Sequence, residues 1–329
     1  MRHTVVFYFL LIFIVVGIMG GSVLSTYSQF VAEGPLEGEK TVLITAGRSV
    51  RKIAKQLYRE GIISSPAVFE IGVRASGNTM NIKAGEYSIP KRSSAKTVMN
   101  ILTSGKTYVR KFVVPEGLTS IQIVELMDGM YGLMGTIEKI PPNGSLLPDT
   151  YWYSYGDTKQ NLLIYMQNGM KRTMDELWAK KSQNLSFQTP VEAIVMASIV
   201  EKETAKASER PHIAAVFHNR LAKKMKLQSD PTVIFAVSQE RGELKRKLTY
   251  SDLKTPHPSN TYVIAGLPDK PICNPGKAAL EAVLNPDNSK DLYFVADGKG
   301  GHIFATTYAE HEKNVAAYRR LSNKQQRAQ

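Results

Sequence analysis

The sequence predicts an α+β protein with a single N-terminal transmembrane helix, a small βα module and a larger mixed α/β domain. Three observations predict this architecture: one long uncharged apolar run, a strand-turn-helix pattern that occurs twice, and a second half in which helical and strand-like segments follow one another. The 329 residues are 43% hydrophobic and 22% charged. These values are ordinary for globular proteins and exclude a wholly disordered or collagen-like chain.

The N-terminal segment 5–24, VVFYFLLIFIVVGIMGGSVL, contains no charged residue. As a helix it would span roughly 30 Å, which matches the hydrocarbon core of a bilayer. The run exceeds the apolar core of a cleaved signal peptide, about 7–15 residues, and neither an A-x-A site nor a cysteine follows it directly. We therefore predict an uncleaved single-pass membrane anchor, with a cleaved signal peptide as the alternative.

The charges that flank this segment indicate its orientation. Arg2 and the terminal amine precede it, whereas three glutamates and Lys40 follow it. Positive residues favour the cytoplasmic side of a membrane. We expect residues 1–4 in the cytoplasm and the chain after the span, from residue 25 on, on the extracytoplasmic side.

The chain is basic, with 42 Lys and Arg against 29 Asp and Glu and a formal net charge of +13. Nucleic acid is the usual partner of such a protein. An exported domain rarely meets nucleic acid, and the sequence contains no RNP, zinc-finger or helix-turn-helix signature. We expect no nucleic-acid partner. Anionic lipid head groups and acidic wall polymers suit the location better, and a simple effect on solubility explains the charge equally well.

Cysteine and histidine usage argues against a metal centre. The lone Cys273 rules out a disulfide within the chain and a zinc site of four thiolates. The six histidines form neither an HExxH nor an HxH pair. We predict no metal and no cofactor.

Residues 25–40 are polar, contain Gly34, Pro35 and Gly38, and predict a stalk. The first module follows at 41–110. It begins with a strand-like run at 41–45, a turn at Gly47 and a helix that Ser49 caps. The apolar positions of that helix, at helical spacing, are Val50, Ile53, Ala54 and Leu57. A further helix near Ser65 and a returning strand at 85–89 complete the module.

The same pattern recurs 70 residues later. FVVPEGLTSIQIVELM at 112–127 aligns with VLITAGRSVRKIAKQL at 42–57, so that Gly117 matches Gly47 and Thr119 matches Ser49. We interpret 111–135 as a second, related βα module. Coincidence is the alternative, because strand-turn-helix units are common.

The second half contains further regular segments. Helical patterns cover 159–177, 190–207, 213–224 and 308–321, strand-like runs cover 292–295 and 302–305, and loops occupy 255–276. The glycine turn at 297–301 joins the two strands. It is not a phosphate loop, because GxxxxGK[ST] is absent.

The helix at 190–207 carries the candidate for chemistry. Thr189 and Pro190 are typical of a helix start, and 191–200 is almost continuously apolar. Such a helix is buried on most sides, and it delivers Glu201 and Glu203 at its end. At about 100° per residue the two glutamates point about 200° apart, so they cannot act as a pair on one bond.

Glu203 shares its helix face with Met196, Ile199 and Val200, which is the more apolar environment. Desolvation there would raise its pKa and keep it protonated, and the negative end of the helix dipole acts in the same direction. A carboxylic acid held in this way can protonate a glycosidic oxygen. The alternative is that Glu-Lys-Glu at a helix end is a solvated surface patch.

Several longer blocks resemble the endolytic murein transglycosylases, the YceG-like family. They are ASIVEKET at 197–204, SER at 208–210, VFHNRL at 216–221, LQSDPTV at 227–233, NTY at 260–262, GLP at 266–268, NPG at 274–276, LYFVADGKGGHIF at 292–304 and LPDTYWY at 147–153. The resemblance extends over nearly the whole chain, including the anchor. His218 is a departure, because an aliphatic residue is expected there, but it puts no catalytic residue in doubt.

The resemblance implies a peptidoglycan lytic transglycosylase of the inner membrane. Such enzymes cut the bond between N-acetylmuramic acid and N-acetylglucosamine inside glycan strands without water, and they leave a 1,6-anhydro end. Glu203 would be the catalytic acid, residues 41–110 a LysM-like module, and 111–329 the catalytic domain. The implied partners are glycan strands, the membrane and penicillin-binding peptidoglycan synthases, with a role in limiting strand length.

A single carboxylate suffices for this chemistry, because the sugar's own 6-hydroxyl replaces water, whereas hydrolases generally need two. Candidate substrate-binding residues are Gln228, Ser229, Asp230, Thr232, Asn260 and Tyr262. For the 228–232 group, a capped helix start is an equally good interpretation. Tyr151, Trp152 and Tyr153 can stack on sugars, although core packing is favoured.

The rival function is a non-catalytic, peptidoglycan-binding envelope scaffold. Products with reducing ends would instead indicate a hydrolase.

Overall fold

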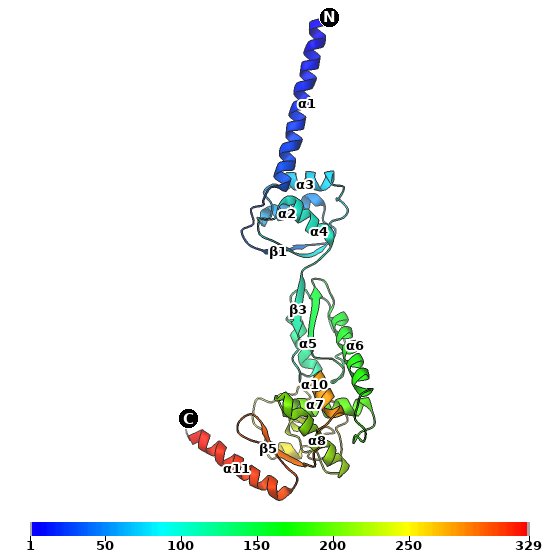
Figure 1. Ribbon diagram of the computed structural model, residues 1–329, viewed down its shortest axis with the longest axis vertical. Helices are drawn as coiled ribbons and strands as arrows, with labels where there is room; N and C mark the ends of the chain where they lie inside the picture. The colour runs from blue at the N-terminus through cyan, green and yellow to red at the C-terminus, as the bar shows by residue number, and fades with distance from the viewer. Residues whose placement is uncertain (1, 328–329) are drawn as a thin grey trace. The chain divides into compact units, whose positions relative to one another are not determined.

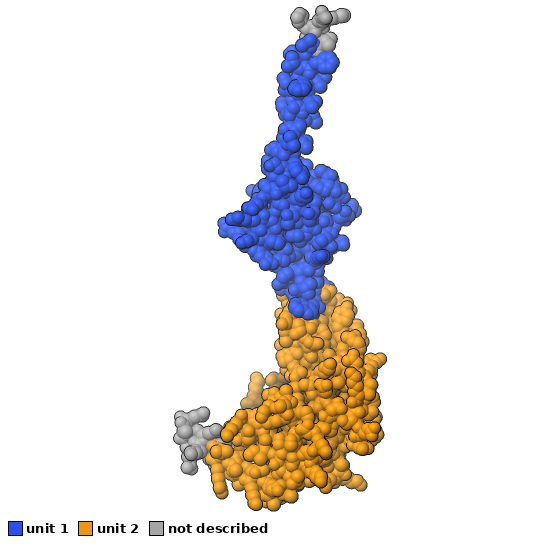
Figure 2. Space-filling view, viewed as in Figure 1, with its two compact units in different colours: residues 1–110, 152–156 blue, residues 111–151, 157–329 orange. Residues whose placement is uncertain are grey.

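The computed structural model describes residues 2–327 and contains two compact units. Unit 1 comprises residues 1–110 and 152–156, and unit 2 comprises residues 111–151 and 157–329 (Figure 2). The amino group of Met1, on which the predicted orientation partly rests, lies outside the described residues. Helices and small two-stranded sheets occur in both units, so the predicted mixture of α and β structure is confirmed.

The N-terminal helix α1 (Arg2–Val31) is long and apolar enough to cross a membrane over Val6–Val31 (Figure 1). It extends beyond the predicted segment 5–24 because residues 25–33 contain neither glycine nor proline. The first part of the predicted stalk, 25–40, is therefore helical. Phe30 is buried in the core of unit 1, so the end of α1 packs on that unit.

Unit 1 consists of β1 (Lys40–Ile44), α2 (Val50–Arg59), α3 (Pro66–Ala75), β2 (Gly85–Ile89) and α4 (Ala95–Ser104), in that order. The two strands pair antiparallel, with Val42 opposite Tyr87. Phe69, Tyr87 and Leu102 are fully buried between the sheet and the helices. Helix α4 is absent from the sequence prediction, although Ser94 caps it and Gly105 ends it in the left-handed conformation.

The two segments that align at an offset of 70 residues adopt the same local structure. Helix α5 (Ser120–Asp128) follows β3 (Val109–Val113), and Thr119 caps it as Ser49 caps α2. Gly47 and Gly117 precede these caps with φ of 76° and 78°. This left-handed conformation favours glycine, which explains why both copies have one. Strand β3 pairs with β4 (Thr150–Ser154).

The core of unit 2 is helical. Its helices are α6 (Lys159–Trp178), α7 (Pro190–Glu203), α8 (Arg210–Ala222), α9 (Asp230–Val237) and α10 (Lys277–Leu284), with short 3₁₀ turns at Ala207–Glu209 and Asp252–Lys254. Helix α7 is central, since α8, α9 and α10 all pack on it. Met196, Ile199 and Val200 of α7 are completely buried there.

Helix α7 ends at Glu203, four residues before the end predicted from the sequence. Thr204 is extended, with φ −144° and ψ 134°, and its hydroxyl accepts a hydrogen bond from the Lys206 backbone N–H at 3.0 Å. Glu203 is therefore the last residue of a buried helix, where its side chain can leave the core.

The C-terminal part of unit 2 is a hairpin followed by a helix. Strands β5 (Tyr293–Ala296) and β6 (His302–Ala305) pair antiparallel, and α11 (Tyr308–Arg327) packs against both. All three elements follow the sequence prediction within a few residues except that α11 is longer. Their packing brings the first turn of α11 close to the hairpin (Figure 1).

Candidate active site

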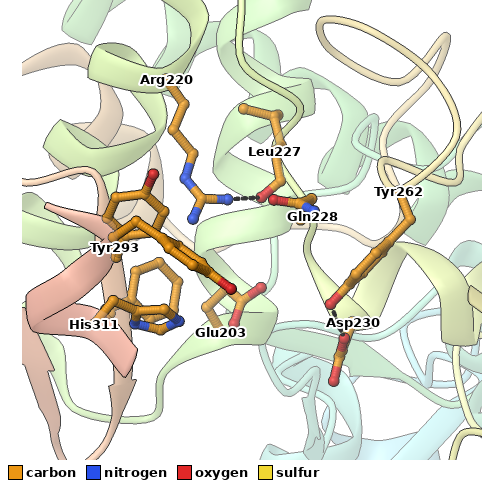
Figure 3. A pocket seen from close by; sticks show the side chains of 10 residues that line it. Glu203, Arg220, Leu227, Gln228, Asp230, Tyr262, Tyr293 and His311 are labelled. Carbon is orange, nitrogen blue, oxygen red and sulfur yellow. Dashed lines mark hydrogen bonds between the residues drawn. The ribbon is translucent and has the colours of Figure 1, made fainter. Parts of the chain in front are cut away.

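Unit 2 contains an open pocket of about 370 Å³ at the end of α7 (Figure 3). Its lining residues are Glu203, Arg220, Leu227, Gln228, Asp230, Tyr262, Tyr293, Phe294, Tyr308 and His311. Four of the seven site residues predicted from the sequence line it: Glu203, Gln228, Asp230 and Tyr262. They come from α7, from the start of α9 with the segment before it, and from the loop before α10, so tertiary packing brings them together.

Glu203 lies partly buried at the wall of the pocket. Burial raises the pKa of its carboxyl to about 7, and the negative charge of Asp230 acts in the same direction. A hydrogen bond from the Ser229 hydroxyl and the positive charge of Arg220 oppose this rise. The acid is therefore poised to give up or take a proton near neutral pH.

The segment that faces Glu203 is held in an unusual conformation. Gln228 has φ of +50°, a region that non-glycine residues seldom adopt. Its N–H donates to the Thr261 carbonyl at 3.2 Å, and the Ser229 N–H donates to the Thr261 hydroxyl at 2.9 Å. These bonds hold Gln228 in the pocket lining and direct the Ser229 hydroxyl onto Glu203.

A second carboxylate lines the same pocket. The Tyr262 hydroxyl donates to Asp230 Oδ1 at 2.6 Å, and burial raises the pKa of this phenol. Figure 3 shows the pair on the side of Glu203 away from Tyr293 and His311. Folding thus brings a second carboxylate, Asp230, within electrostatic reach of Glu203.

Thr232 and Asn260 do not line the pocket, and both are completely buried. The Thr232 hydroxyl donates to the Ser229 carbonyl at 2.6 Å, as expected for the start of a helix. The Asn260 amide donates to the Thr255 carbonyl at 2.9 Å and accepts from the Tyr262 N–H at 2.9 Å. Both residues therefore shape the backbone that carries Ser229 and Tyr262.

Six lining residues are missing from the sequence prediction: Arg220, Leu227, Tyr293, Phe294, Tyr308 and His311. The first four lie inside the blocks VFHNRL, LQSDPTV and LYFVADGKGGHIF. Their place in blocks that resemble the family was the signal that could have identified them. No local pattern marks the two residues of α11. Arg220 joins the parts of this wall, because its guanidinium donates to the Leu227 carbonyl at 2.7 Å and the Leu292 carbonyl at 2.6 Å.

Glu201 has a different role from Glu203. Its buried carboxylate pairs with Arg210 of α8 at 2.8 Å and accepts from the Gly276 N–H at 2.9 Å. It thus connects α7, α8 and the start of α10. The opposite directions predicted from helical geometry are realised, although Glu201 is the more buried of the two glutamates.

The remaining candidates lie elsewhere. Trp152 is exposed on β4, Tyr153 is buried, and neither they nor Tyr151 line the pocket. His218 is internal, with its Nδ1 next to Ser186 and its Nε2 2.9 Å from the Val283 carbonyl. Within residues 2–327, no group of three His, Cys, Asp or Glu side chains is arranged to hold a metal ion.

Comparison with known proteins identifies the family. The model of the YceG-like family matches residues 42–317. The chain belongs to the YceG-like family. The resemblance that the sequence blocks indicate is thereby confirmed.

Named relatives of this YceG-like chain are enzymes. It is 32% identical to the endolytic murein transglycosylase of Bacillus subtilis over 92% of this chain and 91% of that protein. It is 27% identical to the endolytic murein transglycosylase of Streptococcus pneumoniae, of which it spans 58%. A YceG-like protein of Listeria monocytogenes, whose crystal structure has been solved at 2.6 Å, superposes with a TM-score of 0.52 and 32% identity over 84% of this chain and 98% of that one.

Proposed function

We propose that this protein is an endolytic peptidoglycan lytic transglycosylase with Glu203 as its catalytic acid and base. The observation that carries the proposal is the position of Glu203 at the end of a buried helix, in a pocket where its pKa is raised to about 7. The names of its relatives support the same enzyme class.

In the proposed reaction, protonated Glu203 donates its proton to the glycosidic oxygen between N-acetylmuramic acid and N-acetylglucosamine. That carbon–oxygen bond breaks, and the N-acetylglucosamine side leaves as an alcohol. The Glu203 carboxylate then takes the proton of the muramic 6-hydroxyl, whose oxygen bonds to the anomeric carbon. The product is a 1,6-anhydro ring, and Glu203 is protonated again. No water enters, because the attacking oxygen belongs to the substrate and its effective concentration is high.

A pKa of about 7 suits both halves of this cycle. An acid much stronger than this would be ionised before it could donate its proton, and a much weaker one would leave a carboxylate too rarely available as a base. Asp230 helps to keep the proton on Glu203. Its negative charge, in the lining of the same pocket, would also stabilise the positive charge that develops at the anomeric carbon.

The enzyme is proposed to act from the inner membrane. Helix α1 anchors it, residues 1–4 face the cytoplasm, and the chain after α1 lies outside, where nascent glycan is made. The strand-helix-helix-strand order of unit 1, β1-α2-α3-β2, supports its interpretation as a LysM-like, glycan-holding module. A membrane-anchored transglycosylase beside penicillin-binding synthases would limit the length of new glycan strands.

The deciding experiment compares the parental protein with Glu203→Gln on purified murein sacculi. Mass spectrometry of the released fragments distinguishes anhydro ends from reducing ends. We expect anhydro-ended fragments from the parental protein and a loss of at least about 10²–10⁴-fold in rate for the variant. If Glu203→Gln releases anhydro-ended fragments at the parental rate, the assignment is wrong.

A hydrolase is the second candidate, and the presence of Asp230 in the pocket favours it. Hydrolases place two carboxyl groups about 5–5.5 Å or about 6.5–9.5 Å apart and add water to the cut bond. Cleavage in H₂¹⁸O tests this, because only hydrolysis labels the new reducing end. Retention of glycan without any cleavage would instead support the non-catalytic scaffold.

A further inference from the structure

One wall of the pocket is an ordered stack of side chains from the C-terminal half of unit 2. The Arg220 guanidinium lies over the Tyr293 ring at 5.3 Å from its centroid. The His311 ring stacks on Tyr293, with centroids 5.2 Å apart and 23° between the planes. Tyr308 meets Tyr293 edge-on at 5.9 Å. The wall is therefore flat and aromatic, and Figure 3 shows the tip of the His311 ring directed toward Glu203.

The hydrogen bonding of His311 is incomplete. Its Nδ1 is buried and has no partner among residues 2–327, a condition shared there only by Arg210 Nε. In proteins, a buried N–H group without an acceptor is rarer than a buried acceptor atom without a donor. We therefore place the ring proton on Nε2 and leave Nδ1 unprotonated. The Nε2 atom is not enclosed by protein, and His311 lines the pocket. His311 thus offers a single N–H donor to a ligand.

The charges around His311 indicate which ligand group suits it. Burial and the positive charge of Arg220 lower the pKa of His311, while Glu312 acts weakly in the opposite direction, so the ring is neutral at pH 7. The Arg220 guanidinium is already bonded to the Leu227 and Leu292 carbonyls. The neutral Nε2–H of His311 suits a neutral acceptor such as a carbonyl oxygen.

Peptidoglycan strands present one strong neutral acceptor on every sugar, the acetamido carbonyl. The C–H face of a pyranose packs well on an aromatic ring, as Tyr293 provides. N-acetylmuramic acid carries a bulky lactyl substituent that a flat wall does not accommodate. The N-acetylglucosamine ring has no such group.

We propose that Tyr293 and His311 form the subsite for the N-acetylglucosamine ring next to the bond that is cut, with His311 Nε2–H donating to its acetamido carbonyl. This inference rests on the proposed function and names the residues that determine sugar specificity within it. It predicts that the enzyme distinguishes N-acetylated from de-N-acetylated glucosamine, and that this distinction depends on His311.

The test uses the full-length protein and two glycan substrates. Both keep the acetamido group of the muramic sugar, and one has glucosamine in place of N-acetylglucosamine. The readouts are kcat and KM for each substrate. His311→Phe keeps a ring on Tyr293 and removes the donor, His311→Gln retains a donor, and Lys313→Ala is an exposed control on the same helix. Because Arg220 is unchanged throughout, its repulsion of the glucosamine cation affects all the proteins equally.

We expect the parental protein and Lys313→Ala to prefer the N-acetylated strand by about tenfold or more in kcat/KM. His311→Phe should raise KM on that strand by about tenfold with little change in kcat, and its preference should fall severalfold, with part of the loss recovered in His311→Gln. An unchanged preference in His311→Phe would overturn the inference. If Glu203→Gln is inactive in the same assay, that result leaves the proposed function intact, so the two failures can be told apart.

Discussion

The Ser229 hydroxyl donates a hydrogen bond to the Glu203 carboxylate, joining the residue just before α9 to the last residue of α7. This bond favours the ionised form of Glu203, whereas burial and Asp230 favour the protonated form. The pKa of about 7 is the balance of these opposing effects, so it should respond to either.

The first prediction concerns the pH dependence of cleavage. If Glu203 must be protonated to act, kcat/KM should fall as pH rises through about 7, by tenfold for each further unit. Initial rates of anhydro-end formation between pH 5.5 and 9 measure this. A rate that stays constant across that range would show that Glu203 is not the acid.

The second prediction concerns Ser229→Ala. Removing a hydrogen bond to a charged group, worth about 1.5 kcal/mol, raises the pKa of Glu203 by about one unit. The alkaline limb of the kcat/KM profile should therefore move to higher pH by that amount. Ser251→Ala, at an exposed site outside the pocket, should leave the profile unchanged. A downward shift in Ser229→Ala would contradict the hydrogen bond.

The third prediction links Glu203 to stability. The pKa of Glu203 is higher in the folded chain than its ordinary value of 4.5. The contribution of this group to folding stability is therefore greatest below pH 4.5 and is lost as pH rises to about 7. Glu203→Gln removes this penalty. The variant should be more stable than the parent at pH 8, by up to about 3 kcal/mol, and should match it near pH 4. Urea unfolding at both pH values measures the difference, and equal stability at pH 8 would argue against a buried acid.

The fourth prediction separates the two glutamates. Arg210→Met leaves the buried charge of Glu201 without its partner and should cost about 3–5 kcal/mol of unfolding free energy. Glu125 and Arg241 form an exposed pair at 3.0 Å, so Arg241→Ala should leave stability almost unchanged. Urea unfolding of both variants gives the comparison. Similar losses in the two would mean that burial does not strengthen the Glu201 pair.

The fifth prediction tests the packing of α1 on α3. A Cβ atom added at Gly72 would overlap the ring of Phe30. Gly72→Val should therefore destabilise unit 1 by about 1–3 kcal/mol. In a Phe30→Ala background the same substitution should add little, because the overlap is gone. If the stability losses of Gly72→Val and Phe30→Ala are additive in thermal unfolding, the contact with Phe30 does not limit the size of the residue at position 72.

Features that depend on neighbouring residues were predictable from the chain. Ser49, Thr119 and Thr189 cap their helices as the sequence suggests, because a cap needs only the backbone N–H two or three residues ahead. The apolar N-terminal run likewise becomes a helix long enough for a membrane, since its composition alone favours that state. Glu203 could be named as the candidate acid for the same reason, from its apolar helix face and the sequence block around it.

The pocket itself depends on contacts between distant segments, and local patterns cannot reveal these. Tyr293 and His311 lie about 90 and 108 positions after Glu203. They reach the pocket because β5 and β6 contact α8 and α11 packs on both strands. The sequence likewise does not show that Asp230 lies near Glu203. It also does not show that packing buries Asn260, a polar residue, completely. Helix starts and the apolar N-terminal run follow from neighbouring residues in the sequence. The protonation of Glu203 follows from the charges and apolar surfaces that the folded chain brings around it.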